Sequence, residues 1–207
     1  MAEKDPYKNL FIVIYFNSIM PLPPAVKSFL VDKIRSVSFP KNHIICKEGE
    51  LCSKLYLIKK GMVRGYFTTD SHEITTWISS DNDIFTSITG FFRNQPAREN
   101  IQALEDTHCE YLEYEDLQYA IRHFPEIREL NRYMVEEYYM YAENRAFMAR
   151  IPNAQKRWNQ YLENVDPKII HRIPKRYLAS LLAVRPETLS RIMNHHAQTL
   201  KGKESSQ

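Results

Sequence analysis

The spacing of hydrophobic positions changes twice along the chain. Between residues 17 and 37, apolar side chains recur every three or four positions around the proline-rich segment 21–24, which predicts a helix with a turn-rich entry. After Pro40 the apolar residues form short runs of β-branched and aromatic side chains, and from Glu115 onward helical spacing returns. The short runs predict strands at 43–46, 55–58, 62–68, 73–78, 101–104 and 109–114.

This order of elements limits the fold class. The predicted strands are separated by turn-forming residues such as Gly49 and Gly61, and only helices follow them. Many short strands at close spacing indicate an antiparallel roll, barrel or sandwich. The pattern therefore predicts an α+β protein with an N-terminal antiparallel sheet structure and an all-α C-terminal part.

The longest predicted helix covers residues 126–148. An apolar stripe runs along it at intervals of three and four, which fits either packing on the sheets or a dimer seam, and the pattern does not separate the two. The segment Ile151-Pro152-Asn153 then ends the helix, which predicts domains at 1–148 and 149–207. The stripe consists of Ile127, Leu130, Met134, Tyr138 and Tyr141, continued by Phe147 and Met148.

Residues 173–192 have the pattern of a helix-turn-helix. Pro174 and Pro186 each stand where a first helical turn begins, because a missing N–H costs nothing there. Ala183 occupies the turn, where glycine is frequent, and would cost about 1 kcal/mol if a positive φ is required. The expected apolar faces are Leu178, Ala179 and Leu182 on the first helix, Val184 in the turn, and Leu189, Ile192 and Met193 on the second.

The other side of the second helix carries polar residues. Glutamate can accept a hydrogen bond from cytosine N4, and arginine can bind guanine O6 and N7, so Glu187 and Arg191 are candidates for reading bases. The alternative is an intrahelical salt bridge between the two residues. The candidate DNA-contacting residues are Lys175, Arg185, Glu187, Thr188, Ser190, Arg191, Asn194 and His195.

Charge is distributed unevenly between the two predicted domains. The whole chain has a net charge of +3, but residues 149–207 hold 11 Lys or Arg against 4 Asp or Glu. The first 148 residues are net negative by the same count. A basic C-terminal part favours a polyanionic partner such as double-stranded DNA.

Composition excludes several other classes of protein. The 207 residues are 43% hydrophobic and 26% charged, which is typical of a globular protein. The longest apolar run, Leu10 to Phe16, is too short to span a bilayer, and Glu3 and Asp5 do not suit a signal peptide, so we expect a cytoplasmic protein without a membrane segment. Cys46, Cys52 and Cys109 lack metal-binding spacing and are expected to be free thiols.

No enzyme signature is present. The sequence lacks a His-x-His pair, a G-x-S-x-G elbow, a P-loop and a dinucleotide-binding fingerprint. No cofactor or metal is therefore expected, and the chain is not expected to be an enzyme. Haem remains open from sequence, but His43, His72 and His108 fit ordinary strand histidines better.

Four segments of the sequence together have a pattern found in one known family. They are Glu48-Gly49-Glu50, Leu55 to Gly61 with Val63-Arg64, Ala97-Arg98 to Ala103-Leu104-Glu105, and Pro186-Glu187-Thr188-Leu189-Ser190-Arg191. Through them the chain resembles the Crp/Fnr family of bacterial transcription regulators over nearly its whole length. The resemblance implies a cyclic-nucleotide-binding-like β-roll, a long dimerisation helix at 126–148 and a C-terminal helix-turn-helix. It also implies that Glu187 and Arg191 contact base edges, while Pro186 replaces an arginine of the family.

The family's effector pocket is degraded in this sequence. Phe85-Thr86-Ser87 stands where the family has a Phe-Gly-Glu turn for the ribose, and Glu99 follows Arg98 where a hydroxyl residue meets the cyclic phosphate. A carboxylate at that place repels phosphate. Cyclic AMP is therefore not expected to bind, and either another anion meets Arg98 or the pocket is empty.

The resemblance completes the set of expected partners. They are double-stranded DNA, a second copy of the chain through helix 126–148, and RNA polymerase, with an unknown small-molecule effector left open. The 15 residues after Ile192 are too few for the family's wing hairpin, so Lys201 and Lys203 are expected in a solvated tail, with contacts to DNA phosphates as the alternative. The alternative function is a ligand-binding or protein-interaction module whose helical tail does not read DNA.

Overall fold

The computed structural model describes residues 10–70 and 72–204, without the side chains at 167, 168, 196, 197 and 199–204. The chain divides into two compact units. Unit 1 contains the residues up to Phe67 together with Ile78–Tyr139. Unit 2 contains Thr68–Trp77 and the residues from Met140 onward.

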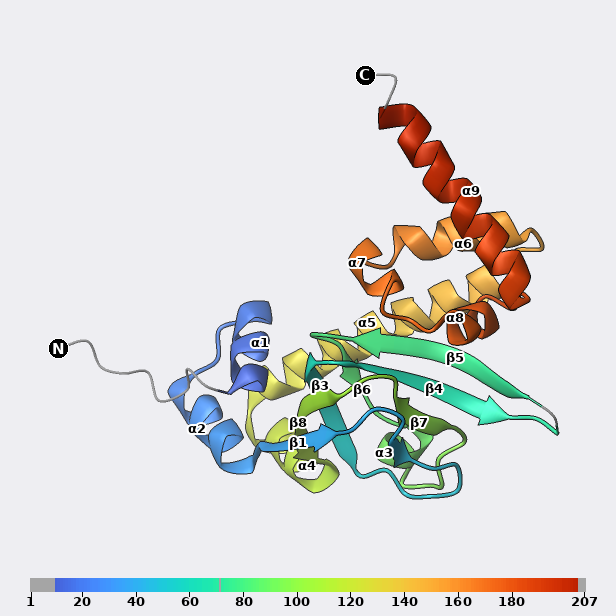
Figure 1. Ribbon diagram of the computed structural model, residues 1–207. Coiled ribbons are helices and arrows are strands. Elements are labelled where there is room, and N and C mark those ends of the chain that lie inside the picture. The colour runs from blue at the N-terminus through green and yellow to red at the C-terminus, as the bar shows by residue number, and fades with distance from the viewer. Residues whose placement is uncertain (1–9, 71, 205–207) are drawn as a thin grey trace. The chain divides into compact units, whose positions relative to one another are not determined.

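Two four-stranded sheets form most of unit 1, except that residues 73–77 of the strand β5 are grouped with unit 2 (Figure 1). The strand orders are β1-β8-β3-β6 and β2-β7-β4-β5, and the pairs are antiparallel wherever a register is assigned. Tyr56 in β3 lies opposite both Tyr111 in β8 and Phe85 in β6, which fixes the register at the centre of the first sheet. The strands are β1 Arg35–Phe39, β2 Ile44–Cys46, β3 Lys54–Lys60, β4 Met62–Thr68, β5 Glu73–Ser80, β6 Ile84–Phe85, β7 Asn100–Ala103 and β8 Thr107–Glu113.

The turn between β3 and β4 requires glycine. Gly61 has φ +132°, and a Cβ atom built on it would lie 2.5 Å from Oγ1 of Thr107. Its N–H donates a hydrogen bond to Oδ1 of Asp81 over 2.6 Å. The close approach of Thr107 therefore excludes any side chain at residue 61.

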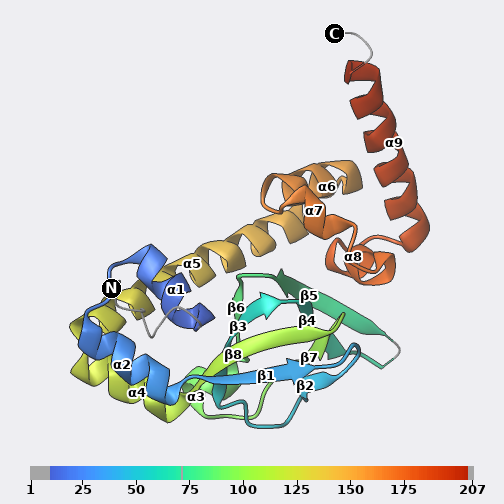
Figure 2. The same cartoon turned by 60° about the vertical axis from the view of Figure 1, so that its left-hand side comes forward.

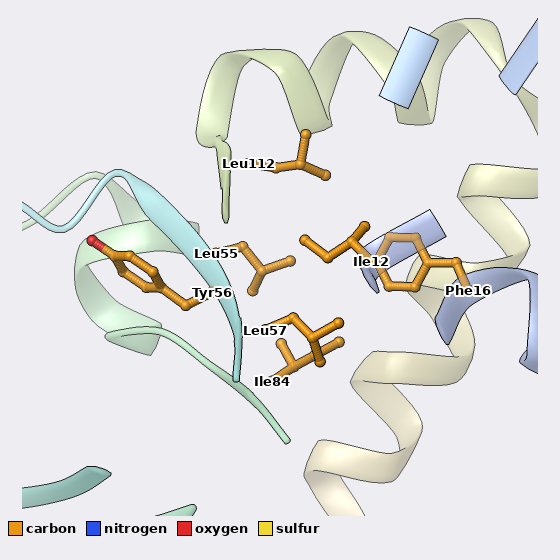
Figure 3. Close-up of a pocket in the computed structure, with 7 residues that line it drawn as sticks. All are labelled: Ile12, Phe16, Leu55, Tyr56, Leu57, Ile84 and Leu112. Atoms are coloured by element: carbon orange, nitrogen blue, oxygen red, sulfur yellow. The ribbon is translucent and has the colours of Figure 1, made fainter. Parts of the chain in front are cut away.

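An apolar core joins the first sheet to the helices of unit 1. The helices α1 (Phe11–Ile19), α2 (Pro24–Lys33) and α4 (Tyr114–His123) lie together beside the sheets, as Figure 2 shows. Figure 3 shows Ile12 and Phe16 of α1 among aliphatic side chains of the sheet, while the Tyr56 ring points away. The space between them has essentially no room for water, so this apolar pocket is packing and not a ligand site. Its other lining residues are Leu55, Leu57, Ile84 and Leu112.

A buried carboxylate anchors α1 to the sheet. Glu110 in β8 has a side chain only 1% exposed, and it accepts hydrogen bonds from the N–H groups of Phe11 (3.0 Å) and Ile12 (2.7 Å). Nζ of Lys59 lies 3.2 Å from the same carboxylate. Glu110 thus satisfies free N–H groups at the start of α1 with a charge that the helix dipole favours.

The helix predicted over residues 17–37 is confirmed only from Pro24 to Lys33, after the expected turn-rich entry, and its two ends are wrong. The structure has α1 before it, a break at residues 20–23, and then α2, which begins at Pro24. Pro21, Pro23 and Pro24 cannot donate the backbone hydrogen bonds that would continue α1, whereas Pro24 suits the first position of a new helix. Residues 35–39 are strand β1 because they pair with β8.

The six predicted strands are confirmed within about two residues at each end. The two-residue strand β6 and the six-residue helix α3 (Ile88–Arg93) were not predicted. The predicted helix at 126–148 is α5 (Pro125–Arg150), and residues 151–153 are not helical, as expected.

Unit 2 contains four further helices around a small core. Trp158, Tyr161, Leu178, Leu182 and Leu189 are buried in it. Within residues 10–70 and 72–204, no helix is long and apolar enough to cross a membrane. The helices are α6 Ala154–Glu163, α7 Pro167–Ile170, α8 Lys175–Leu181 and α9 Pro186–Glu204.

The segment Thr68–Trp77 belongs to unit 2 through α8. The N–H of Thr75 donates a hydrogen bond to Oγ of Ser180 over 2.9 Å. The same hydroxyl donates to the carbonyl of Glu73 over 3.4 Å. One serine on α8 therefore holds the first residues of β5.

Candidate nucleic-acid interface and effector pocket

The turn between α8 and α9 has a defined backbone conformation that ends α8. Ala183 has φ +49°, so the positive φ considered from the sequence is present. The N–H of Val184 donates to the carbonyl of Ala179 over 2.9 Å, and the N–H of Ala183 donates to that of Ser180 over 3.0 Å. This is the Schellman pattern of a helix C-terminus, with alanine at the position where glycine is most common. A helix-turn-helix follows from it, because α9 begins three residues later at Pro186.

Arg157 on α6 holds this turn, and the sequence did not reveal its role. Its Nε donates to the carbonyl of Leu182 over 2.8 Å, and its Nη2 donates to that of Ala183 over 3.2 Å. Its Nη1 donates to the carbonyls of Ile151 (2.6 Å) and Pro152 (3.3 Å). The guanidinium therefore satisfies carbonyls of the turn and of the segment after α5 at once.

The two sides of α9 differ in burial. Leu189 is fully buried inside unit 2, and Ile192 and Met193 are half-buried. Glu187 and Arg191 are exposed one helical turn apart, and Asn194 and His195 continue the exposed side. The structure thus leaves a polar stripe on α9 open to solvent, and we call it the polar stripe of α9.

The remaining candidate DNA-contacting residues surround this stripe. Lys175 at the start of α8 and Arg185 just before α9 are exposed, whereas Thr188 and Ser190 are half-buried. The alternative of a salt bridge within the stripe is absent, because among the described residues no ion pair joins Glu187 to Arg191. Both side chains are therefore available to a partner.

The segment after Ile192 is helical, because α9 continues to Glu204. No proline interrupts the segment, and helix-favouring residues such as Ala197, Gln198 and Leu200 extend it. The side chains of Lys201 and Lys203 lie outside the described residues.

At the expected effector pocket, the side chains of residues 85–87 are buried rather than exposed. Phe85 is buried and stacks on Tyr56 with ring centroids 4.8 Å apart. The hydroxyl of Thr86 donates to the carbonyl of Lys54 over 2.8 Å. Ser87 is buried as the N-cap of α3, where its Oγ accepts a hydrogen bond from the N–H of Gly90 over 3.3 Å. All three side chains at the expected ribose position are therefore occupied by contacts inside unit 1.

The expected phosphate position is more open. Arg98 is exposed and Glu99 is half-buried. The residue before them, Ala97, is hydrogen-bonded to the turn at 47–50, because its carbonyl accepts from Gly49 (2.9 Å) and its N–H donates to Glu50 (2.8 Å). Two backbone hydrogen bonds therefore hold the segment that carries Arg98 against the 47–50 turn.

A cavity of about 130 Å³ lies beside this turn. Among the described residues, none of the five at the expected effector pocket lines it. The hydroxyl of Thr86 nevertheless lies 3.8 Å from Sγ of Cys52 at its wall. The lining residues are Ile45, Cys46, Glu50, Leu51, Cys52, Ser53, Lys54 and Tyr56.

The histidines considered for haem have ordinary contacts in the sheets. His43 stacks on Phe39, and Nδ1 of His108 lies 2.7 Å from Oγ of Ser38, while His72 is exposed. Across the described part of the chain there is no cluster of three or more His, Cys, Asp or Glu side chains that could hold a metal ion.

Comparison with known proteins bears on both units. Residues 36–124 match the family model of the cyclic nucleotide-binding domain. FixK2 from Bradyrhizobium japonicum aligns with a TM-score of 0.71 at 20% identity, covering 80% of this chain and 86% of FixK2. The chain has the fold of the Crp/Fnr regulators. The β-roll and the helix-turn-helix order implied by the resemblance are thereby confirmed.

Two further regulators of this fold cover still more of the chain. A putative transcriptional regulator of the Crp/Fnr family from Eubacterium rectale aligns with a TM-score of 0.67 at 19% identity, covering 90% of this chain and 88% of its own. The c-di-GMP responsive global regulator CLP from Xanthomonas campestris aligns with a TM-score of 0.66 at 14% identity, covering 86% of this chain and 93% of CLP. Both of these proteins are described as regulators. A comparison with curated protein sequences finds no match.

Proposed function

We propose that this protein is a homodimeric, sequence-specific DNA-binding regulator of transcription. The polar stripe of α9 is the observation that carries the proposal, because a second helix that exposes Glu187 and Arg191 is shaped to enter the major groove. The Crp/Fnr fold supports it, since the compared proteins with that fold are transcription regulators.

Charge around the stripe supports binding to the phosphate backbone. Lys175, the first residue of α8, and Arg185, the residue before α9, are exposed. Residues 149–207 contain 11 basic and 4 acidic residues. In this proposal Lys175 and Arg185 contact phosphates, and Thr188, Ser190, Asn194 and His195 complete the contacts that Glu187 and Arg191 make with bases.

Exposed hydrophobic side chains on α5, most of them beside the predicted stripe, support a dimer. Ile127 and Leu130 are buried and Met134 packs against the core of unit 1, so the first part of the stripe does pack on the protein itself. Tyr133, Met140 and Phe147 are exposed at intervals of seven residues, so they occupy one position of a heptad repeat. We infer that these three residues meet their counterparts in a second copy, which makes the protein read a near-palindromic site with half-sites about 34 Å apart.

The proposal assigns no cyclic AMP to the β-roll. Thr86 and Ser87 are occupied by internal hydrogen bonds, and Glu99 follows Arg98 where a hydroxyl is needed. The compared regulator CLP is described as responsive to c-di-GMP, so the fold alone does not determine which effector binds. Titration calorimetry with cyclic AMP should show no heat of binding, and micromolar affinity would contradict this part of the proposal.

Selection of binding sites from a random DNA pool tests the function. We expect enriched, near-palindromic sites whose affinity falls steeply with salt. Arg191→Ala should weaken binding by roughly 1 to 3 kcal/mol and relax the preference at one base pair, whereas Lys175→Ala should weaken all sequences alike and reduce the salt dependence. No enrichment, or equal losses on selected and random DNA for Arg191→Ala, would favour the alternative of a module that does not read DNA. RNA polymerase remains the expected protein partner of the bound regulator.

The dimer is tested separately. Met140→Glu places a charge in the seam and should convert the protein to a monomer in sedimentation velocity. Ala146→Glu adds the same charge at an exposed position of α5 that lies off the seam and should leave the dimer intact. A dimer that survives Met140→Glu and Phe147→Glu would place the interface elsewhere.

A further inference from the structure

Most of the residues that line the cavity of about 130 Å³ beside the 47–50 turn are polar. Its rim includes Glu50, Leu51 and Ser53, which are exposed, so a small solute can enter it. A cavity needs only about 10 to 15 Å³ to hold one water molecule, and this one therefore has room for a small organic molecule.

Tyr56 brings a hydroxyl without a protein partner to this cavity. Side chains alternate along β3, so Leu55 and Leu57 face α1 while the Tyr56 ring points to the other side of the sheet, as Figure 3 shows. The residue is only 6% exposed and its ring stacks on Phe85, but its hydroxyl has no hydrogen bond to any described residue. Burial raises the pKa of this hydroxyl, so it stays protonated and can donate and accept. A ligand that supplies the missing partner gains free energy from it.

The charged groups at the cavity leave one carboxylate available. Nζ of Lys54 lies 3.7 Å from Oε1 of Glu113 and 4.8 Å from the centroid of the Tyr111 ring, so its positive charge already has partners. Oε2 of Glu50 accepts a hydrogen bond from the N–H of Lys47 over 3.1 Å. Among the described residues Glu50 has no ion pair. The rim of the cavity therefore presents a negative charge that no protein cation neutralises.

The two cysteines of the wall do not add to this charge. The S–H of Cys46 donates to the carbonyl of Lys47 over 3.7 Å, and the S–H of Cys52 donates to the carbonyl of Lys54 over 3.9 Å. Because a carbonyl oxygen only accepts, these contacts favour the protonated thiols. Together with Ile45 they form a weakly polar wall that suits a short carbon chain.

We propose that this cavity binds a small alkylammonium compound that also carries a hydroxyl group. The ammonium group pairs with the carboxylate of Glu50 at the rim, the carbon chain lies against the wall that includes Ile45, and the hydroxyl group hydrogen-bonds to the hydroxyl of Tyr56. Glu50 repels a phosphate or carboxylate ligand. The site differs from the expected cyclic-nucleotide pocket, whose five residues do not line the cavity, and it does not depend on DNA binding.

Three solutes of similar size and different charge test the proposal. Ethanolamine is a cation at neutral pH, ethylene glycol is neutral and glycolate is an anion. A TROSY NMR titration of the full chain at constant ionic strength follows the backbone amides of residues 45–56. We expect saturable shifts with ethanolamine, at the millimolar affinity typical of so small a ligand, and no saturable shifts with the other two solutes.

Three variants locate the contacts. Glu50→Gln removes the charge but keeps an acceptor for the N–H of Lys47, and should weaken ethanolamine binding at least about tenfold. Glu48→Gln is the matched control, because Glu48 is exposed on the same turn and does not line the cavity, and it should leave the affinity unchanged. Tyr56→Phe keeps the stacked ring and should weaken binding about two- to tenfold. Its unfolding midpoint should not change, since the lost hydroxyl has no partner in the described protein.

Ethanolamine binding that is equally strong in Glu50→Gln would overturn the proposal, and so would equal shifts with ethylene glycol. Binding of glycolate instead of ethanolamine would also overturn it and would favour an anion near Arg98. The absence of saturable shifts around the cavity with all three solutes would have the same consequence. None of these measurements involves DNA, so they leave the proposed function untouched.

Discussion

The expected effector region of unit 1 and the recognition helix of unit 2 use polar side chains in opposite ways. Thr86 and Ser87 are buried, and each hydrogen-bonds to the backbone nearby. Glu187 and Arg191 are exposed, and no ion pair joins them. A polar side chain that is bonded internally supports the fold, whereas one left to solvent at a helix surface is available for a partner. The difference explains why we assign recognition to α9 and no cyclic nucleotide to the β-roll.

Substitutions can separate these two uses of polar groups, because internally bonded residues should affect stability and the polar stripe should affect DNA affinity. The largest stability effect is expected at Glu110. Glu110→Gln replaces a carboxylate oxygen that accepts from the start of α1 by an amide donor, and should cost about 3 kcal/mol. Hydrogen exchange should show faster exchange across α1.

A carboxylate on the same strand provides the control for this change. Glu113 pairs with Lys54 over 3.7 Å at the surface, and Glu113→Gln should cost less than about 1 kcal/mol. Equal protection of α1 in both variants would show that Glu110 does not hold the helix.

The next largest effect is expected at Arg157. Arg157→Ala removes donors from four carbonyls and should destabilise unit 2 by about 2 kcal/mol. Fluorescence in a denaturant titration reports this unit through Trp158, which is buried in its core. Lys156→Ala, at the exposed neighbouring position, should leave the midpoint unchanged, and a similar shift in both variants would contradict the role of the guanidinium.

A smaller effect is expected at Ser87. Ser87→Ala removes the N-cap of α3 and should cost about 1 kcal/mol, measured as the free energy of unfolding. Ser53→Ala, which removes an exposed hydroxyl bonded to Glu113, should cost less. If Ser87→Ala instead left stability unchanged and altered the affinity for a small molecule, the hydroxyl would serve a ligand, and the contrast with α9 would weaken.

The smallest effect is expected at Ala183, with the opposite sign. Ala183→Gly relieves the positive φ and should stabilise unit 2 by up to about 1 kcal/mol. Ala146→Gly, inside α5, should destabilise by about the same amount, since glycine is unfavourable in a helix interior. Tryptophan fluorescence measures both variants, and a loss of stability at residue 183 would show that glycine is not preferred in this turn.

The strands and the helix-turn-helix could be predicted because their information is local. Strand β4 agrees with the predicted segment 62–68, and the prolines at 174 and 186 stand at the starts of α8 and α9. Helix α1 and strand β1 depend on distant partners instead. The start of α1 is bonded to Glu110, and β1 exists through its pairing with β8, so no pattern within residues 10–39 reveals either one.

The candidate sites likewise contain residues that local sequence predicts and residues that depend on distant partners. The exposed side of α9 follows from helical spacing, so Glu187, Arg191, Asn194 and His195 could be placed together from the sequence. The role of Arg157 could not, because its acceptors are backbone carbonyls up to 26 residues away.

The hydrogen bonds of Arg157 also have a mechanical consequence. One rigid, planar guanidinium holds the carbonyls of Ile151 and Pro152 just after α5, and those of Leu182 and Ala183 just before α9. Torsion applied at the C-terminal end of α5 must therefore turn the start of α9 with it, or break charge-assisted bonds. The coupling lies in the placement of one side chain and needs no flexible hinge.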